Sequence, residues 1–383
     1  MIYLDYNATT PVDPEVLAAM LPFLEEDFGN PTSAHSIGQL AAAAIEDARE
    51  SVAAFLGADS ASEIVFTSGG TEGNNWSILG TIANSGDKRR IITTPVEHAN
   101  VRKLCSKLES DGTITVRVLN VDGNGEIDLD ELRKSLTPDT AIVSMMLANN
   151  ETGVIFPVQE AAKIVKENSD AVFHVDAVNG AGKTAFSLRD TEIDLLSISA
   201  HKFYGPKGVG ALFIRKGVEL PPALIGGGQE MGRRAGTPPT HQIVGLGVAA
   251  KIAARLDGIE HLGRLRDRLE DALLEIPSTR VNGTREPDKR LPNTTNISFE
   301  NTNGEMIMHR LDELRICVST GSACHTKGHA ASSVLEAMQV PFSFAMGSIR
   351  FSLGRHTTDD EITEVIERTS AVVSSLRSQA VAN

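Results

Sequence analysis

The chain has 383 residues, of which 41% are hydrophobic, and a formal net charge of −14. This length allows two domains, or one large and one small domain, with a sizeable core. The acidic balance argues against a nucleic-acid-binding surface and against binding to anionic membranes, because both need clustered Lys and Arg.

The number and spacing of the cysteines, together with the first ten residues, indicate the cellular compartment of the protein. Three widely spaced cysteines, Cys105, Cys317 and Cys324, do not form a disulfide framework. The opening stretch MIYLDYNATT has no features of a signal peptide, and no apolar run approaches the length of a membrane span. We therefore expect a soluble cytoplasmic protein with reduced thiols.

Short apolar segments alternate with amphipathic ones over the first two thirds of the chain. The periodicity predicts helices at 14–28, 35–56, 72–83, 100–108, 159–167 and 243–273, the last one interrupted near Gly258. It predicts strands at 63–67, 90–94, 113–119, 140–147, 171–176, 195–199 and 209–214. This alternation is typical of α/β proteins with a mostly parallel sheet, in which ligands bind beyond the strand ends.

The remainder of the chain indicates a smaller α+β domain. Strands are predicted at 294–299, 316–319 and 349–352, with helices at 304–314 and from Thr358 onward. We expect a large domain formed by residues 14–257 and a small domain formed by residues 1–13 and 258–383.

Lys202 lies in the turn between the predicted strands 195–199 and 209–214, among small and hydroxyl-bearing residues. A lysine in this position either extends its amine to solvent or to an acid, or is desolvated for Schiff-base chemistry. The lysine alone does not decide between these alternatives.

A loop at 68–75, Ser-Gly-Gly-Thr-Glu-Gly-Asn-Asn, precedes a predicted helix. Its glycines allow backbone amides to approach an anion, and the helix N-terminus adds partial positive charge. The loop is either a phosphate cradle or a plain connection. It lacks the spacing of a Walker motif or of a dinucleotide fingerprint.

Two further polar residues end predicted strands or follow them. Asp176 is a carboxylate at the end of a buried strand; it caps a turn or pairs with a cationic heterocycle nitrogen. His98 caps a helix or lies as an aromatic plate over a cofactor ring, where its nitrogen can act in acid–base chemistry.

Cys324 lies in a stretch rich in small and polar residues, which favours a reactive thiolate. A metal site formed with His325 and His329 is less favoured because structural zinc needs four ligands, so we expect no metal. Cys105 and Cys317 fall in apolar surroundings and are interpreted as structural. Arg350 lies inside a predicted strand, as a buried ion pair or as a bidentate clamp for a substrate carboxylate.

Over essentially its whole length the chain resembles the pyridoxal-phosphate (PLP)-dependent cysteine desulfurases of the class-V aminotransferase group. The matching motifs, in order, are YLDYNATTP from Tyr3, FGNPTSAH from Phe28, TSGGTE from Thr67, Glu97-His98, NNETG from Asn149, HVDAV from His174, SAHKFYGPKG from Ser199, GGGQE from Gly226, RAGT from Arg234, TGSAC from Thr320 and IRFSLGR from Ile349. The resemblance implies a fold-type I PLP-dependent transferase.

The resemblance also implies roles for individual residues. Lys202 would hold PLP as a Schiff base, Cys324 would take the sulfur and His98 would stack on the ring. The phosphate would be held by Gly70, Thr71, Ser199 and His201, with Thr237 reaching in from the second subunit of a homodimer. Asp176 would pair with the ring nitrogen, Asn150 and Asn179 would lie near the ring oxygen, and Arg350, with Asn150, would bind the substrate.

The implied reaction converts L-cysteine to L-alanine and leaves the sulfur on Cys324 as a persulfide, for an acceptor protein such as an iron–sulfur scaffold. Two positions depart from the family pattern. Asn179 replaces the usual Gln, and His325-Thr-Lys-Gly-His follows Cys324 in place of a Ser-Gly-Ser-Leu-Glu-Pro-Ser-like run. The second departure leaves a selenocysteine lyase as an alternative. Another class-V enzyme and a non-catalytic scaffold are the more distant alternatives.

Overall fold

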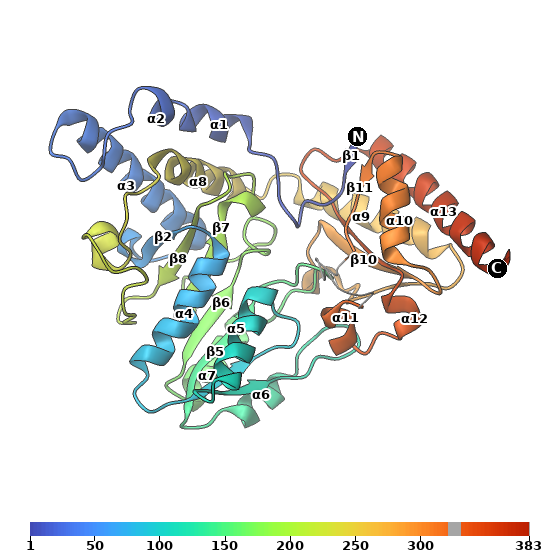
Figure 1. Cartoon of the computed structure of the whole chain (residues 1–383), viewed down its shortest axis with the longest axis horizontal. Helices are drawn as coiled ribbons and strands as arrows, with labels where there is room; N and C mark the ends of the chain where they lie inside the picture. The colour runs from blue at the N-terminus through green and yellow to red at the C-terminus, as the bar shows by residue number, and fades with distance from the viewer. Residues whose placement is uncertain (321–330, 383) are drawn as a thin grey trace.

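A seven-stranded sheet forms the centre of the larger part of the molecule (Figure 1). The computed structural model describes residues 1–320 and 331–382. The strands lie in the order β2-β8-β7-β6-β5-β3-β4, and β8 runs in the direction opposite to the other six. The mostly parallel α/β sheet expected from the sequence is therefore confirmed. Its strands are β2 (Ile64–Thr67), β3 (Arg90–Thr93), β4 (Thr115–Val118), β5 (Thr140–Met146), β6 (Val172–Asp176), β7 (Leu195–Ser199) and β8 (Gly210–Ile214).

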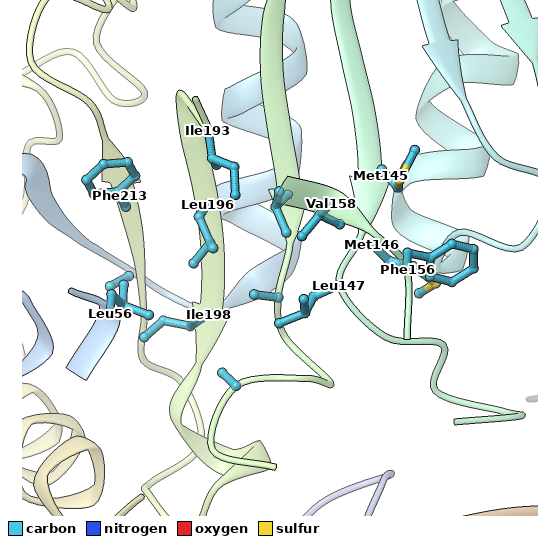
Figure 2. Close-up of a cluster of buried hydrophobic side chains, with 14 of the residues drawn as sticks. Leu56, Met145, Met146, Leu147, Phe156, Val158, Ile193, Leu196, Ile198 and Phe213 are labelled. Atoms are coloured by element: carbon cyan, nitrogen blue, oxygen red, sulfur yellow. The ribbon is translucent and has the colours of Figure 1, made fainter. Parts of the chain in front are cut away.

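Successive strand residues point to opposite faces of a sheet. Both faces are apolar here, because apolar residues occupy consecutive positions of the strands. Leu195 packs beside Trp76 of α4, whereas Leu196 and Ile198 belong to the cluster on the other face. Figure 2 shows this second cluster, where Leu56 lies beside Ile198 and Phe213. The helices of this part are α1 (Pro14–Met20), α2 (Pro22–Glu25), α3 (Ser36–Leu56), α4 (Gly70–Asn84), α5 (Ala99–Ser110), α6 (Leu129–Ser135), α7 (Val158–Asn168) and α8 (Thr240–Ala253).

A three-stranded antiparallel sheet, β12-β10-β9, forms the centre of the smaller part. The N-terminal strand β1 (Ile2–Tyr3) crosses to this part and pairs in parallel with β11 (Ile316–Cys317) (Figure 1). The remaining elements are β9 (Thr279–Val281), β10 (Thr294–Phe299), β12 (Ser348–Ser352), α9 (Ile259–Leu274), α10 (Gly304–Glu313), α11 (Ser333–Ala337), α12 (Phe342–Ala345) and α13 (Asp359–Ala382). No helix in the described ranges is both long and apolar enough to cross a bilayer.

Most predicted elements lie within two residues of the observed ones, and the differences have local causes. The helix predicted at 14–28 is two short helices, because Pro22 begins a second one after Leu21. The helix α3 ends at Gly57, which has a φ of 71° and so provides the left-handed cap. The strand β9 and the helices α11 and α12 are absent from the sequence prediction.

A buried ion pair lies beside the smaller core. Glu270 of α9 is fully buried, and its Oε2 accepts from Arg290 Nη2 and from Thr295 Oγ1, both at 2.6 Å. Burial acts to raise the pKa of Glu270, but Arg290, Thr295 and Arg285 outweigh it and lower the pKa. The carboxylate is therefore held charged within the fold.

Replacing Glu270 by Gln should destabilise the protein by about 3–5 kcal/mol at neutral pH, because Arg290 is left buried without its counter-charge. The lowered pKa means that this contribution is present above the ordinary pKa of 4.5 and is lost as the pH falls through the lowered value. Denaturant unfolding at several pH values measures the difference. The exposed pair Arg133–Asp130 supplies the control Asp130→Asn, expected to cost under about 1 kcal/mol. Equal costs for the two variants would contradict the prediction.

Candidate active site

A cavity of about 870 Å³ lies at the carboxyl ends of β5, β6 and β7. This is where a parallel sheet is expected to bind its ligand. Ten of the predicted site residues line it: Gly70, Thr71, His98, Asn150, Asp176, Asn179, Ser199, His201, Lys202 and Arg350. Thr237 is exposed and does not line the cavity of its own chain, and Cys324 lies outside the described residues.

One end of the cavity has the features of an anion cradle. The helix α4 begins after Gly69, whose φ of 147° is accessible to glycine, and no side chain caps its first amides. A Cβ on Gly70 would lie 2.3 Å from Cγ2 of Val178, so a larger residue would displace this turn. The hydroxyls of Thr71 and Ser199 line the same cavity. Together these groups suit a phosphate.

Asp176 is held in the site by neutral donors. Asn74 Nδ2 donates to its Oδ2 at 2.6 Å, and the amide of Val178 donates to its Oδ1 at 3.0 Å. Burial raises the pKa of Asp176 against the opposing effects of the Val178 amide, His98, Asn74 and Lys202, and none of the ion pairs within the described ranges includes Asp176. A buried carboxylate beside a cavity and without a cationic partner is stabilised by a ligand cation such as a protonated ring nitrogen.

Lys202 is the last residue of a short helical turn, Ala200–Lys202, that follows β7. Its Nζ donates to the carbonyl of Asn7 at 2.6 Å and to that of Ala8 at 3.0 Å. Burial and Arg350 lower the pKa of Lys202 to about 8, against the opposing effects of Asp176 and Asp5. The neutral fraction of the amine near neutral pH is therefore far larger than for an ordinary lysine, which favours nucleophilic chemistry.

The two histidines of the site have different surroundings. His98 Nδ1 accepts from the amide of Asn100 at 3.3 Å and so caps α5, while its exposed ring lines the cavity. The helix-capping and the site interpretations of His98 are thus compatible. His201 Nδ1 lies 3.1 Å from Thr9 Oγ1, and burial together with Lys202 lowers the pKa of His201 to about 4. His201 is neutral at physiological pH.

Asn179, the departure from the family pattern, forms hydrogen bonds to the protein through both its amide nitrogen and its amide oxygen. Its Nδ2 donates to the carbonyl of Asn149 at 3.2 Å, and its Oδ1 accepts from Lys183 Nζ at 3.0 Å. Lys183 also donates to Asn7 Oδ1 at 2.9 Å. Burial, Lys202 and Arg350 lower the pKa of Lys183 well below its ordinary value.

Several cavity-lining residues have no role in the sequence analysis, among them Asn7, Glu97 and Glu151. Glu97 is buried, and its Oε1 accepts from Thr94 Oγ1 and from the amide of Met146, whereas its Oε2 has no partner in the described ranges. Burial raises the pKa of Glu97 to about 8, and Asp176 adds to this. The signal that could have found Glu97 is its position beside His98 in one of the matching motifs.

The comparisons with known proteins agree with this geometry. The chain belongs to the family described as aminotransferase class-V, which matches residues 2–365. It is 51% identical over 380 residues to a cysteine desulfurase of Trichormus azollae, with 98% of this chain and 94% of that protein covered.

Two further relatives point in the same direction. The chain is 46% identical over 381 residues to the cysteine desulfurase NifS of Azotobacter vinelandii, with 98% of this chain and 93% of that protein covered. A solved structure named NifS-like protein matches with a TM-score of 0.91 and 42% identity, covering 98% of this chain and 100% of the other.

Substituting Glu97 by Gln should remove the free-energy cost of ionising a buried carboxyl group, which depends on pH. A raised pKa favours the protonated acid in the folded state, so the wild-type protein loses stability as the pH rises from the ordinary value of 4.5 to about 8. The amide imitates the neutral acid, and we expect it to stabilise the protein by about 1–3 kcal/mol above that range. Denaturant unfolding at acidic and alkaline pH measures the gain. The exposed Glu160→Gln of α7 is the control, and a Glu97→Gln effect that is independent of pH would contradict the assignment.

Proposed function

We propose that the chain is a PLP-dependent cysteine desulfurase that converts L-cysteine to L-alanine and transfers the sulfur to Cys324. The observation that carries the proposal is that one cavity is lined by an amine with a lowered pKa (Lys202), a buried unpaired carboxylate (Asp176) and an arginine (Arg350). The names of the relatives favour this activity over the selenocysteine lyase alternative.

The residues present fit PLP. The anion cradle at the start of α4, with Gly70, Thr71, Ser199 and His201, would hold the phosphate. Asp176 would face the ring nitrogen, and His98 would cover one face of the ring. Asn150 and Asn179 would lie near the ring oxygen, where Asn179 keeps one amide hydrogen beyond its bond to Asn149.

When bound, PLP supplies an electron sink for the carbanion that forms at the substrate Cα. Lys202 would hold the cofactor covalently, and its neutral amine would act as the base for the proton at the substrate Cα. Asp176 would favour the protonated form of the ring nitrogen, because a carboxylate within hydrogen-bonding distance stabilises that cation. Arg350, beside Asn150, binds the substrate carboxylate and fixes the orientation of Cα.

The sulfur transfer balances without an external oxidant. The substrate Cβ–S bond breaks and an S–S bond forms with the Cys324 thiolate, so that the sulfur is oxidised while Cβ is reduced to the methyl group of alanine. The product is a persulfide on Cys324, which an acceptor protein such as an iron–sulfur scaffold would collect. The chemistry needs a free thiolate, which is consistent with a cytoplasmic location.

We also propose a homodimer in which Thr237 reaches the site of the other subunit. The segment before Thr237 is tied down by two ion pairs, Arg49–Glu230 at 2.7 Å and Arg234–Glu72 at 2.9 Å. It nevertheless leaves Ile225 95% exposed. Further exposed apolar side chains lie on α1, α2 and α3 and between them: Leu17, Leu21, Leu24, Phe28, Ile37 and Leu40. Such surfaces are typical of subunit interfaces.

The domain division proposed from the sequence, residues 14–257 against 1–13 and 258–383, is supported by two separate apolar cores. One contains Val143 and Leu196, and the other contains Ile2, Leu265 and Ile349. The helices α11 and α12 fall in the small-domain range but pack on the first core. They therefore form a contact between the two domains.

Lys202→Ala should lose about 10²–10⁴-fold in the rate of alanine formation, because it removes both the attachment point and the base. Borohydride reduction followed by peptide mass analysis should place the cofactor on Lys202 in the wild-type protein. Lys183→Ala is the control for modification of a second lysine of low pKa and should leave the labelled peptide unchanged. Label on any other lysine would contradict the assignment.

Cys324→Ala should abolish nearly all alanine formation from L-cysteine but spare much of the turnover of L-selenocysteine, since selenium depends less on a protein thiol. Product analysis with both substrates, with and without a thiol reductant, measures this. Cys317→Ala removes a half-buried thiol of β11 that does not line the cavity and should behave as wild type. Unchanged turnover of L-cysteine by Cys324→Ala would rule out the desulfurase.

A further inference from the structure

The N-terminal segment brings a carboxylate to the arginine of the site. Arg350 lies on β12 and is 6% exposed, and its Nη2 forms an ion pair with Asp5 Oδ1 at 2.6 Å. The N-terminal segment is also held beside β12 by its backbone, because Asp5 forms a parallel bridge to Ser352. Asp5 does not line the cavity itself, so it acts on the site through Arg350.

One guanidinium nitrogen of Arg350 has no hydrogen-bond partner within the described ranges. Nη1 donates to the carbonyl of Asn150 at 2.9 Å, and Nη2 donates to Asp5. The buried Nε is the nitrogen without a partner. In an arginine, the Nε hydrogen and one Nη2 hydrogen point in parallel along one edge, and this spacing matches the two oxygens of a carboxylate.

We propose that Asp5 is a positioning residue for substrate binding, which holds Arg350 so that its Nε–Nη2 edge faces the α-carboxylate of the substrate. This inference rests on the proposed function. Two contacts from different elements, the carboxylate of Asp5 and the carbonyl of Asn150, fix the plane of the guanidinium. A freely rotating arginine would lose this preorganisation.

The charge of Asp5 has a second effect on the same site. Lys202 is surrounded by Arg350 of β12, which lowers its pKa, and by Asp176 of β6 and Asp5 of the N-terminal segment, which raise it. Lys183, next to Asn7, adds a further amine to this group. Asp5 therefore offsets part of the positive charge that Arg350 brings to the cavity.

The test is Asp5→Asn in the full-length, cofactor-loaded protein. We expect the KM for L-cysteine to rise about 10- to 100-fold with a much smaller change in kcat, because a charge-assisted contact that orients the arginine is lost. The affinity for L-alanine, measured by calorimetry, should fall by a similar factor. The pH at which Lys202 titrates, followed by absorbance, should move to lower values.

Binding of cysteamine distinguishes a loss of arginine orientation from a general loss of ligand binding. Cysteamine has the amine and thiol of cysteine but no carboxylate, so Asp5→Asn should change its dissociation constant far less than that of L-alanine. Asp5→Glu should recover part of the affinity for L-alanine. Asp13→Asn is the matched control. Asp13 also forms an ion pair with an arginine, Arg355, at 2.8 Å, but neither residue lines the cavity.

An unchanged or lowered KM, or an equal loss of affinity for cysteamine and L-alanine, would overturn the inference. The same is true if Asp13→Asn reproduces the effect. Failure of the proposed function would be seen differently, as a wild-type protein that forms no alanine from L-cysteine. Affinity for L-alanine would still report on Asp5 in that case.

Discussion

The polar contacts of Asn7 join the parts of the site to one another. This residue is 1% exposed, and its carbonyl accepts from the Lys202 amine. Its side chain donates to the carbonyl of Asn150 and to Thr294 Oγ1, and its Oδ1 accepts from Lys183 Nζ and from Asn293 Nδ2. These contacts fix the position of the N-terminal segment relative to the central sheet and the smaller sheet beside the cavity. Every group of Asn7 that can form a hydrogen bond is used, which makes the site intolerant of a shorter or apolar residue there.

Charge balance is the second constraint on the site. Two lysines and an arginine face the same region as Asp5 and Asp176, while Glu97 is kept protonated by burial. Because the surroundings have a low dielectric constant, each of these charges acts on its neighbours more strongly than it would in water. The lowered pKa of Lys202 and the raised pKa of Asp176 are two results of the same burial, which shifts each group toward its neutral form; a cation bound beside Asp176 would shift that residue back toward the carboxylate.

The sequence predicted the central sheet well because its strands are buried on both faces. The stretch at 195–199 is an uninterrupted apolar and hydroxyl-bearing run, and it is observed as β7 with the same bounds. The edge strand β9 was missed because it is only three residues long and half-buried, so its pattern resembles that of a loop. The helices α11 and α12 were missed because four or five residues are too few to show a helical period.

The site was predicted in part. Lys202 and Asp176 could be selected because a charged residue directly after a buried strand is unusual. Asn7 and Asp5 give no such signal: each is a polar residue in a short N-terminal segment, and their partners are far away in the sequence. Cys317 was interpreted as core but is half-buried, because Ile316 and Val318 point inward and the residue between them points to the opposite side.

The path of the N-terminal segment has a consequence for the order of events during synthesis. The amide of Asn7 donates to the hydroxyl of Ser352, which lies 345 residues later in the chain. Asp5 and its partner Arg350 are separated by the same 345 residues. At about 5–20 residues per second, the ribosome exposes the first ten residues many seconds before their partners exist. The central sheet can form during that interval, but the end of the cavity that contains Arg350 cannot. The newly made chain therefore acquires a complete site only after β12 has been synthesised, and any ligand that needs Arg350 binds after that point.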